Sequence, residues 1–449
     1  MKYSPPFSPA RLSRLLLTAA SVWFASLGAL HAQSFAFTTA AGLAGTNGAG
    51  FANGTNSTAR FHEPGSVAVD GAGNLYVADT SNHTIRKVTP AGSTWVVTTI
   101  AGSPGASGTN DGANNAARFF FPYGIAVDAQ TNLYVADTYN HTIRKITPSG
   151  TNWVVSTLAG TPGSHGTGDG LGYSASFFNP YGVAVDSLGN VFVADTYNHT
   201  IRMLVPVGTN CSVSTLAGSA GTLGIADGSN SVARFQFPCG VAAGPGTNVY
   251  VADTYNSTIR RITPSGTNWV VTTLAGFAEF NGFADATNSS ALFNFPFGVA
   301  VDSATNLYVV DTDNDAIREL MAFGTNWVAT TIAGSVQVIG TNDGAGSAAL
   351  FSAPQGLAVD AAGKLYVADT FNNTIRVGRL GFSLQAALLG GQLVLSWPAA
   401  ATNYVLETKA TLAPGPWTPV TTGVFLLGNT FVKTNSVVGG SGYYRLHKP

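Results

Sequence analysis

The chain has 449 residues, of which 45% are hydrophobic and only 10% charged, and its formal net charge at pH 7 is −1. Because Lys and Arg form no cluster outside the N-terminal segment, the composition argues against a nucleic-acid partner. With few charges of either sign, solubility must come from Ser, Thr and Asn side chains and from backbone exposed in Gly-rich loops.

The N-terminal segment has the pattern of a secretory signal peptide. Lys2, Arg11 and Arg14 precede an apolar run from Leu15 to Leu30, and the sequence Leu-His-Ala follows before position 33. A basic start, a short apolar core and a small residue at the exit predict that residues 1–32 are cleaved on export. The run is short for a membrane span, and an uncleaved anchor is the alternative. Cleavage removes three positive charges and no acids, which moves the net charge from −1 to −4. No other segment could cross a bilayer as a helix, so we expect no membrane span in the mature chain.

The next part of the chain repeats one motif six times at a constant spacing of 58 residues. Its core reads Tyr-Val-Ala-Asp-Thr, then Asn, then Ile-Arg. The repeated aspartates are Asp79, Asp137, Asp195, Asp253, Asp311 and Asp369, and an arginine follows each by seven residues, from Arg86 to Arg376. Repeats of this kind bury their apolar faces only against their neighbours.

The second copy predicts four short antiparallel strands, over residues 123–128, 133–138, 142–147 and 153–159. Alternating β-branched and aromatic residues indicate the strands, and Asn, Gly and Pro mark the turns between them. A long Gly-rich connector, residues 160–179, leads to the next copy. Four strands per copy and no helical stretch predict a β-propeller of six blades, because a closed ring protects its strand edges.

The two ends of the repeat region indicate how the ring closes. The last copy has no fourth strand after Arg376, whereas Phe37-Thr-Thr-Ala-Ala41 stands before the first copy and matches Val97-Thr-Thr-Ile-Ala101. We therefore predict that the N-terminal strand completes the sixth blade. An open solenoid is the alternative, but it would need polar caps at both ends.

The repeated segment Tyr134-Val-Ala-Asp-Thr-Tyr-Asn-His-Thr-Ile-Arg144, preceded by Phe121-Pro-Tyr-Gly-Ile-Ala-Val-Asp128, resembles an NHL repeat. The resemblance covers about residues 34–379, and the long connectors are similar to those of exported bacterial and large extracellular members. It implies a binding scaffold in general. A minority of six-bladed relatives are enzymes, among them peptide-amidating lyases and gluconolactonase-like hydrolases, with metal ligands near the central channel.

The repeat ends near residue 380, and residues 380–449 resemble a small fibronectin-like β-sandwich of exported bacterial proteins. About five strands are expected, within residues 393–397, 403–408, 417–420, 431–433 and 443–446. We expect Trp397 and Trp417 to lie in its core rather than to form a ligand platform. The predicted organisation is therefore a signal peptide (1–32), a propeller (33–379) and a small sandwich (380–449).

Several repeated polar residues suit structural roles better than metal or charge chemistry. Each Asp is expected to cap its own turn and to pair with an Arg of the same or the next blade, because a ligand seldom needs six identical contacts. Histidine is a common metal ligand, but equivalent turns lie too far apart around a ring to share one ion. We predict no metal site, although loop calcium is possible at the connector Asp-Gly pairs. The candidates are His83, His141 and His199 in the turns and Asp111, Asp169, Asp227 and Asp343 in the connectors.

The two cysteines, Cys211 and Cys239, replace aromatic residues of neighbouring copies. One falls on an outermost strand and the other on an innermost strand of the next blade, too far apart for a disulfide. We therefore predict two free, poorly reactive thiols.

Positions where the six copies disagree indicate a binding surface. The residue after the repeated proline and the residue before the repeated Asn vary, and both gather at the face that carries the long connectors. Aromatic and amide groups suit sugar and peptide recognition, and plain packing of the connectors is the alternative. The predicted ligand-binding face consists of Tyr123, Tyr181, Phe297, Gln355, Tyr139, Tyr197, Tyr255 and Phe371.

We therefore predict an exported, non-catalytic scaffold, secreted or on a bacterial cell surface, that binds a protein or glycan. The alternative is a metal-dependent lyase or gluconolactonase-like hydrolase with its site in the central channel, for which His62 and Glu63 are the best catalytic candidates. A surface-layer component that self-assembles is a third class. The sequence specifies neither the ligand nor the oligomeric state.

Overall fold

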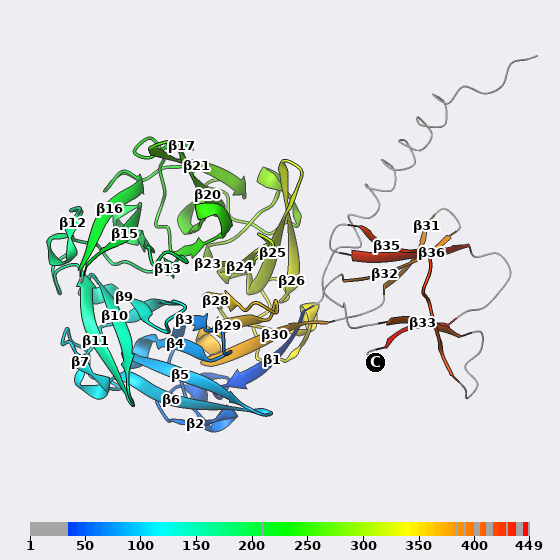
Figure 1. The fold of residues 1–449 in the computed structure, drawn as a ribbon, viewed down its shortest axis with the longest axis horizontal. Coiled ribbons are helices and arrows are strands. Elements are labelled where there is room, and N and C mark those ends of the chain that lie inside the picture. Colours follow the sequence, from blue (N-terminus) through cyan, green and yellow to red (C-terminus); the bar gives the residue numbers. More distant parts are fainter. Residues whose placement is uncertain are drawn as a thin grey trace, which may run out of the picture. The chain divides into compact units, whose positions relative to one another are not determined.

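The computed structural model describes residues 35–208, 210–381, 385–389, 392–398, 405–409, 416–427, 430–436 and 443–447. The predicted signal peptide lies outside these residues. The chain divides into two compact units, and one of them spans Phe35–Leu380. Figure 1 shows this unit as a ring of small sheets arranged around a centre.

The second blade illustrates how each sheet is built. From the channel outward it contains β8 (Pro122–Val127), β9 (Leu133–Asp137), β10 (Thr142–Ser149), β11 (Asn152–Ala159) and the two-residue β7 (Gly112–Ala113). All five residues of β9 are buried. An interior strand covered on both faces reads as a continuous apolar run, as the Leu-Tyr-Val-Ala sequence of β9 does.

The other five blades repeat this order. The first contains β3 (Pro64–Val69), β4 (Leu75–Asp79), β5 (Thr84–Ala91), β6 (Thr94–Gly102) and β2 (Gly54–Thr55), and the third β13 (Val183–Val185), β14 (Val191–Asp195), β15 (Thr200–Val207), β16 (Asn210–Gly218) and β12 (Gly170–Leu171). The fourth contains β18 (Gly240–Ala243), β19 (Val249–Asp253), β20 (Thr258–Ser265), β21 (Asn268–Ala275) and β17 (Gly228–Ser229), and the fifth β23 (Pro296–Val301), β24 (Leu307–Asp311), β25 (Ala316–Phe323), β26 (Asn326–Ala333) and β22 (Ala286–Thr287). The sixth contains β28 (Gly356–Val359), β29 (Leu365–Asp369), β30 (Thr374–Leu380), β1 (Phe35–Ala41) and β27 (Gly344–Ala345).

The N-terminal strand closes the ring, as predicted. β1 pairs antiparallel with β30, so strands from the two ends of the repeat region lie side by side (Figure 1). Phe37 is fully buried and packs edge-on against Phe351 at 5.2 Å between ring centres. The innermost strands contact one another in sequence around the ring, and β28 contacts β3 to complete it. The six-bladed, all-β architecture expected from the sequence is therefore confirmed.

The fifth strand of each blade was not predicted. It is a two-residue segment of the long connector that pairs with the outermost long strand, as Gly112 and Ala113 pair with Val155 and Val154. Each connector therefore covers the outer edge of the blade that it leads into, and shields that edge from pairing with another chain.

A short 3-10 turn follows the second strand of every blade and ends in a left-handed residue. In the second blade this turn spans Thr138–Asn140, and His141 adopts φ 60° and ψ 32°. Asn, Asp and His are enriched in this conformation, which is why they alternate at this position in five of the six copies. The other turns are Thr80–Asn82, Thr196–Asn198, Thr254–Asn256, Thr312–Asn314 and Thr370–Asn372.

The second unit contains two small antiparallel sheets. One holds β31 (Gln385–Leu389), β32 (Gln392–Pro398), β36 (Thr430–Ser436) and β35 (Val424–Leu427), and the other β34 (Thr418–Pro419), β33 (Val405–Lys409) and β37 (Tyr443–His447). All five predicted strands form, and β31 and β35 were missed. Trp397 is buried against Phe431, as expected, whereas Trp417 is half-buried, with the Arg445 guanidinium 4.5 Å from its ring centre.

Candidate functional site: the channel mouth

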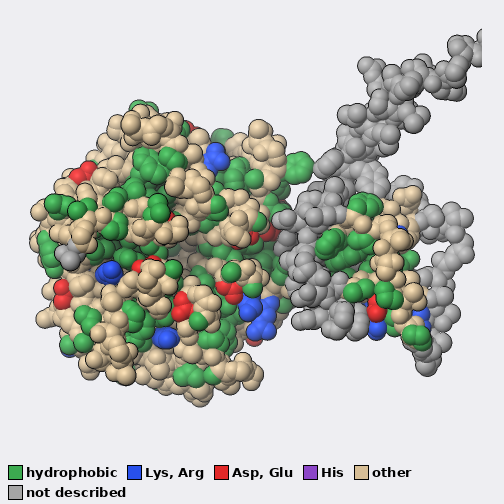
Figure 2. Space-filling view, viewed as in Figure 1, with side chains coloured by type: hydrophobic (Ala, Val, Ile, Leu, Met, Phe, Trp, Pro, Cys, Tyr) green, Lys and Arg blue, Asp and Glu red, His purple; other side chains and the backbone are tan. Residues whose placement is uncertain are grey.

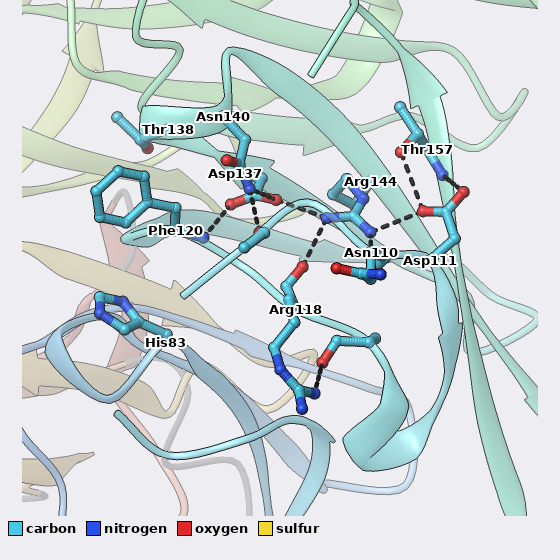
Figure 3. Close-up of polar contacts among 12 residues, drawn as sticks. His83, Asn110, Asp111, Arg118, Phe120, Asp137, Thr138, Asn140, Arg144 and Thr157 are labelled. Atoms are coloured by element: carbon cyan, nitrogen blue, oxygen red, sulfur yellow. Dashed lines mark hydrogen bonds and ion pairs between the residues drawn. The ribbon is translucent and has the colours of Figure 1, made fainter. Parts of the chain in front are cut away.

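A buried Asp–Arg pair holds the turn beside the channel mouth in each blade. Figure 3 shows the pair of the second blade. In the second blade, Arg144 Nη1 lies 2.6 Å from Asp137 Oδ2, and both side chains are buried. Asp137 also accepts hydrogen bonds from the Phe120 backbone N–H at 2.7 Å and from Asn140 Nδ2 at 2.8 Å. Burial raises the pKa of Asp137, and this effect outweighs the lowering by Arg144 and these N–H donors. The resulting pKa is about 6. The carboxylate therefore stays ionised at neutral pH and fixes the turn.

The second nitrogen of each arginine reaches the connector. Arg144 Nη2 lies 2.7 Å from Asp111 Oδ1, and the Asp111 side chain is 42% exposed. The arginines of the third to sixth blades make the same contact, with Asp169, Asp227, Asp285 and Asp343. The sequence motif missed Asp285 because Ala286 replaces the glycine that follows the other four.

The first blade is the exception, because Arg86 Nη2 donates to Asn53 Oδ1 at 3.0 Å. The predicted pairing of each repeated Asp with an Arg is thus confirmed. Each of the five connector aspartates is paired with its own arginine. They are therefore poorly placed to bind a calcium ion together.

Three histidines bridge neighbouring blades at the same face. The Nδ1 atoms of His83, His141 and His199 each accept the backbone N–H of the residue before the next repeated proline, at 3.2 Å. Asp315 and Asn373 accept the equivalent bond with side-chain oxygens. The histidines therefore act as turn residues, in agreement with the structural interpretation of the sequence.

These contacts predict a pH dependence of stability. An Nδ1 atom that accepts a hydrogen bond must be unprotonated, and burial lowers the pKa of all three histidines from 6.5. As the pH falls below about 6.5, these histidines take up protons more readily in the unfolded chain than in the folded one. The free energy of unfolding therefore decreases as the pH falls. A His83→Asn/His141→Asn/His199→Asn variant keeps an acceptor, as Asn373 does. We expect its melting temperature to fall less between pH 7 and pH 5 than that of the wild type. An equal fall in both proteins would contradict this role.

Aromatic side chains fill the centre of the ring. Tyr123, Tyr181 and Phe297 follow the repeated proline at the start of, or just before, three innermost strands, and their ring centres lie between 4.6 and 5.8 Å apart. The Tyr123 hydroxyl donates to Gln355 Oε1 across the ring at 2.5 Å. The space left between the six innermost strands is only about 70 Å³. These four residues of the predicted binding face therefore plug the channel and are largely buried.

The other four predicted residues lie exposed around this plug. Their exposure ranges from 41% for Tyr197 to 56% for Phe371, with Tyr139 and Tyr255 between these values. Phe237 contacts both Tyr197 and Tyr255, at 5.2 and 4.8 Å between ring centres. The arc continues through Phe121 beside Tyr139 and Phe295 beside Tyr255, both from the position before the repeated proline. We call Tyr139, Tyr197, Tyr255 and these three phenylalanines the aromatic arc.

The repeated positions around the mouth carry no Lys or Arg. The position before the proline, the position after it, the turn residue and the left-handed residue together contribute three acids, Glu63, Asp313 and Asp315. All three lie on the first and fifth blades, away from the middle of the aromatic arc. On the one face of the molecule that Figure 2 shows, charged side chains are scattered among hydrophobic and uncharged polar groups. This mouth suits a neutral or cationic ligand better than a phosphate-rich one.

His62 and Glu63 precede the first innermost strand at the channel mouth, and both make hydrogen bonds within the first blade. Glu63 Oε2 accepts from Ser81 Oγ at 2.7 Å, and the His62 backbone N–H donates to Asp79 Oδ1. A catalytic role for the pair stays a prediction. Among the described residues, no group of three or more His, Cys, Asp or Glu side chains could hold a metal ion.

Cys211 and Cys239 are both free and buried, as predicted. Burial raises the pKa of both thiols, that of Cys239 to about 12, which keeps them protonated and unreactive. In the described part of the chain, no helix has the length and hydrophobicity needed to span a membrane.

Comparison with known proteins supports the repeat assignment. The NHL repeat family model matches residues 61–88, 119–146, 178–203 and 351–377. The chain is 30% identical over 335 residues to Protein SUPPRESSOR OF QUENCHING 1, chloroplastic, of Arabidopsis thaliana, which covers 71% of this chain and 30% of that protein. It is 31% identical over 345 residues to NHL repeat-containing protein 2 of Bos taurus, which covers 70% of this chain and 46% of that protein. The chain thus spans less than half the length of these relatives.

The fold is also similar to solved structures. An auxiliary nutrient binding protein from Bacteroides ovatus matches with a TM-score of 0.57 at 16% identity, over 77% of this chain and 76% of that one. At this identity the likeness shows the fold alone. The chain therefore carries NHL repeats in at least four of its blades, and the six copies of this motif fold as a six-bladed β-propeller.

Proposed function

We propose that the protein is an exported, non-catalytic binding scaffold that recognises a protein or glycan on the connector-rich face around the channel mouth. Export is expected from the signal sequence of residues 1–32, and the C-terminal unit would act as a spacer or attachment module. Tyr139, Tyr197 and Tyr255 would supply most of the contact area, since tyrosine offers a large apolar ring and a hydroxyl at low entropic cost.

The observation that carries this proposal is a filled channel beside exposed aromatic rings. Ligand pockets usually measure roughly 300–1,000 Å³, whereas the channel offers about 70 Å³. The aromatic arc, in contrast, has its tyrosines on the 3-10 turns of the second, third and fourth blades, and these tyrosine rings are exposed. Exposed apolar surface rimmed by polar groups is typical of an interaction site.

The same volume weighs against the hydrolase or lyase alternative. A lactone or peptide in the channel would have to displace the bridge from Tyr123 to Gln355 and the rings packed on it. His62 and Glu63 would then need a substrate within hydrogen-bonding reach at the rim. A binding role needs no such rearrangement.

The test is to screen peptide and glycan arrays with the full propeller and two variants. We expect Tyr197→Ala/Tyr255→Ala to lose binding by at least tenfold, because exposed anchors of an interface each contribute about 1–2 kcal/mol. Leu188→Ala is the matched control, since Leu188 is 74% exposed but lies in the turn after β13, at the opposite end of its blade. Loss of binding in the control, or retention in the double variant, would overturn the proposal.

A further inference from the structure

A separate open groove lies at the outer edge of the ring, between the first and second blades. Its volume is about 870 Å³, and its wall is formed by the end of β6, from Thr98 to Gly102, together with Pro104. Trp153 of β11, Lys87 of β5 and the exposed Phe51 contribute its largest side chains. The groove shares no lining residue with the channel.

Lys87 is the charged group of this groove. Its Nζ lies 5.9 Å from the ring centres of both Tyr76 and Trp153. Among the described residues it forms no ion pair, and no Asp or Glu lines the groove. The connector of the first blade carries Asn53 where the connectors of the other five blades carry an aspartate. The outer edge of the ring therefore has one acid fewer here than at the other blades.

Several other residues of the lining are polar and uncharged. Thr98, Asn115 and Thr151 are exposed, and Ser103 is partly exposed. Hydroxyl and amide groups of this kind pair with sugar hydroxyls, and a tryptophan ring covers the C–H face of a pyranose. An unpaired ammonium beside such a platform would complement a carboxylate on the sugar.

The equivalent grooves lack part of this set. The groove between the second and third blades is lined by Lys145, but Cys211 occupies the position of Trp153. Its volume is about 400 Å³. Between the fourth and fifth blades, Arg261 and Trp327 line a smaller groove of about 320 Å³. Only the first of these three combines a lysine, a tryptophan and room for several sugar units.

We propose that the groove between the first and second blades binds an acidic polysaccharide, with Trp153 stacked on a sugar ring and Lys87 paired with a uronate carboxylate. An acidic peptide is the competing ligand for the lysine. The groove favours a sugar because its two aromatic side chains are the exposed ring of Phe51 and the ring of Trp153, which is partly buried against Tyr76 and keeps part of its surface in the groove. The inference does not depend on the proposed role of the channel mouth.

The test measures the affinity of the full mature chain for oligogalacturonate, alginate and hyaluronan oligosaccharides, and for oligoglutamate. Methyl-esterified oligogalacturonate serves as the uncharged probe. We expect at least one uronate ligand to bind, and its ester to bind about tenfold more weakly. Lys87→Met should cause a similar loss for the acid form and leave the ester unaffected, since Met203 occupies the same position in the third blade.

Lys145→Met is the matched control and should bind as the wild type does. Trp153→Ala should weaken both acid and ester, provided that its melting curve shows a folded propeller; Lys87→Met keeps the test decisive if it does not. No uronate binding, equal losses in Lys87→Met and Lys145→Met, or binding of oligoglutamate alone would each overturn the inference. Because Tyr197→Ala/Tyr255→Ala should retain this uronate binding, failure here is distinguishable from failure of the proposed function.

Discussion

Replacing Asp137 with asparagine is expected to lower the free energy of unfolding by about 3–5 kcal/mol, the usual result of breaking a buried ion pair. The substitution removes the charge that faces Arg144 Nη1 and leaves a buried guanidinium with a weaker acceptor. The turn at the channel mouth would also lose the charge that orders it. Urea unfolding of wild type and variant measures the difference.

Asp111→Asn is the control for this prediction. Its carboxylate is 42% exposed and contacts the same guanidinium, and exposed pairs contribute only about 0–1 kcal/mol. The first blade already carries Asn53 at this position and keeps the hydrogen bond to its arginine. A destabilisation by Asp111→Asn as large as that by Asp137→Asn would contradict a ranking of the two acids by burial.

The second large effect is expected where the ring closes. Phe37 faces Gly378 across the β1–β30 pair, whereas the first four blades have Val at the Phe37 position and a larger aliphatic residue at the Gly378 position. A Cβ on Gly378 would come within 2.5 Å of the Phe37 ring. The closing strand therefore pairs a large side chain, Phe37, with a glycine, whereas the first four blades pair two aliphatic side chains of similar size.

A double-mutant cycle tests this pairing. Phe37→Val should cost about 2–4 kcal/mol through the cavity it leaves, and Gly378→Val about 1–3 kcal/mol or more through overpacking. The double variant restores the arrangement of the other blades, so we expect it to be more stable than either single variant. Additive losses in thermal or urea unfolding would mean that the two side chains do not share one space.

The sequence predicted the repeat architecture because each element recurs with its neighbours in register. The match of Phe37–Ala41 to Val97–Ala101 was enough to predict the closing strand. Strict repetition was enough to predict that each Asp pairs with an Arg, but it did not decide between an Arg of the same blade and one of the next. The two-residue outer strands were missed, since two residues carry no periodicity. Without the glycine that marks the other copies, Asp285 was also missed.

The candidate site was predicted less completely. Copy-to-copy variation identified residues that do gather at one face, because turn and strand starts meet there in every blade. It could not separate Tyr123, which points into the channel and bonds to a residue 232 positions away, from Tyr197, which faces solvent. Side-chain direction at a ring centre depends on all six blades at once. The groove at Lys87 and Trp153 escaped for the same reason, since it joins residues of two blades.

The most direct measurement of the central claim is hydroxyl-radical footprinting of the propeller with a ligand selected from the arrays. The account predicts protection of Tyr139, Tyr197 and Tyr255 on binding, with Tyr123 and Tyr181 unchanged because they are already packed in the channel. Protection confined to the channel residues, or a ligand that is chemically altered on incubation, would contradict a binding scaffold and favour a site inside the ring.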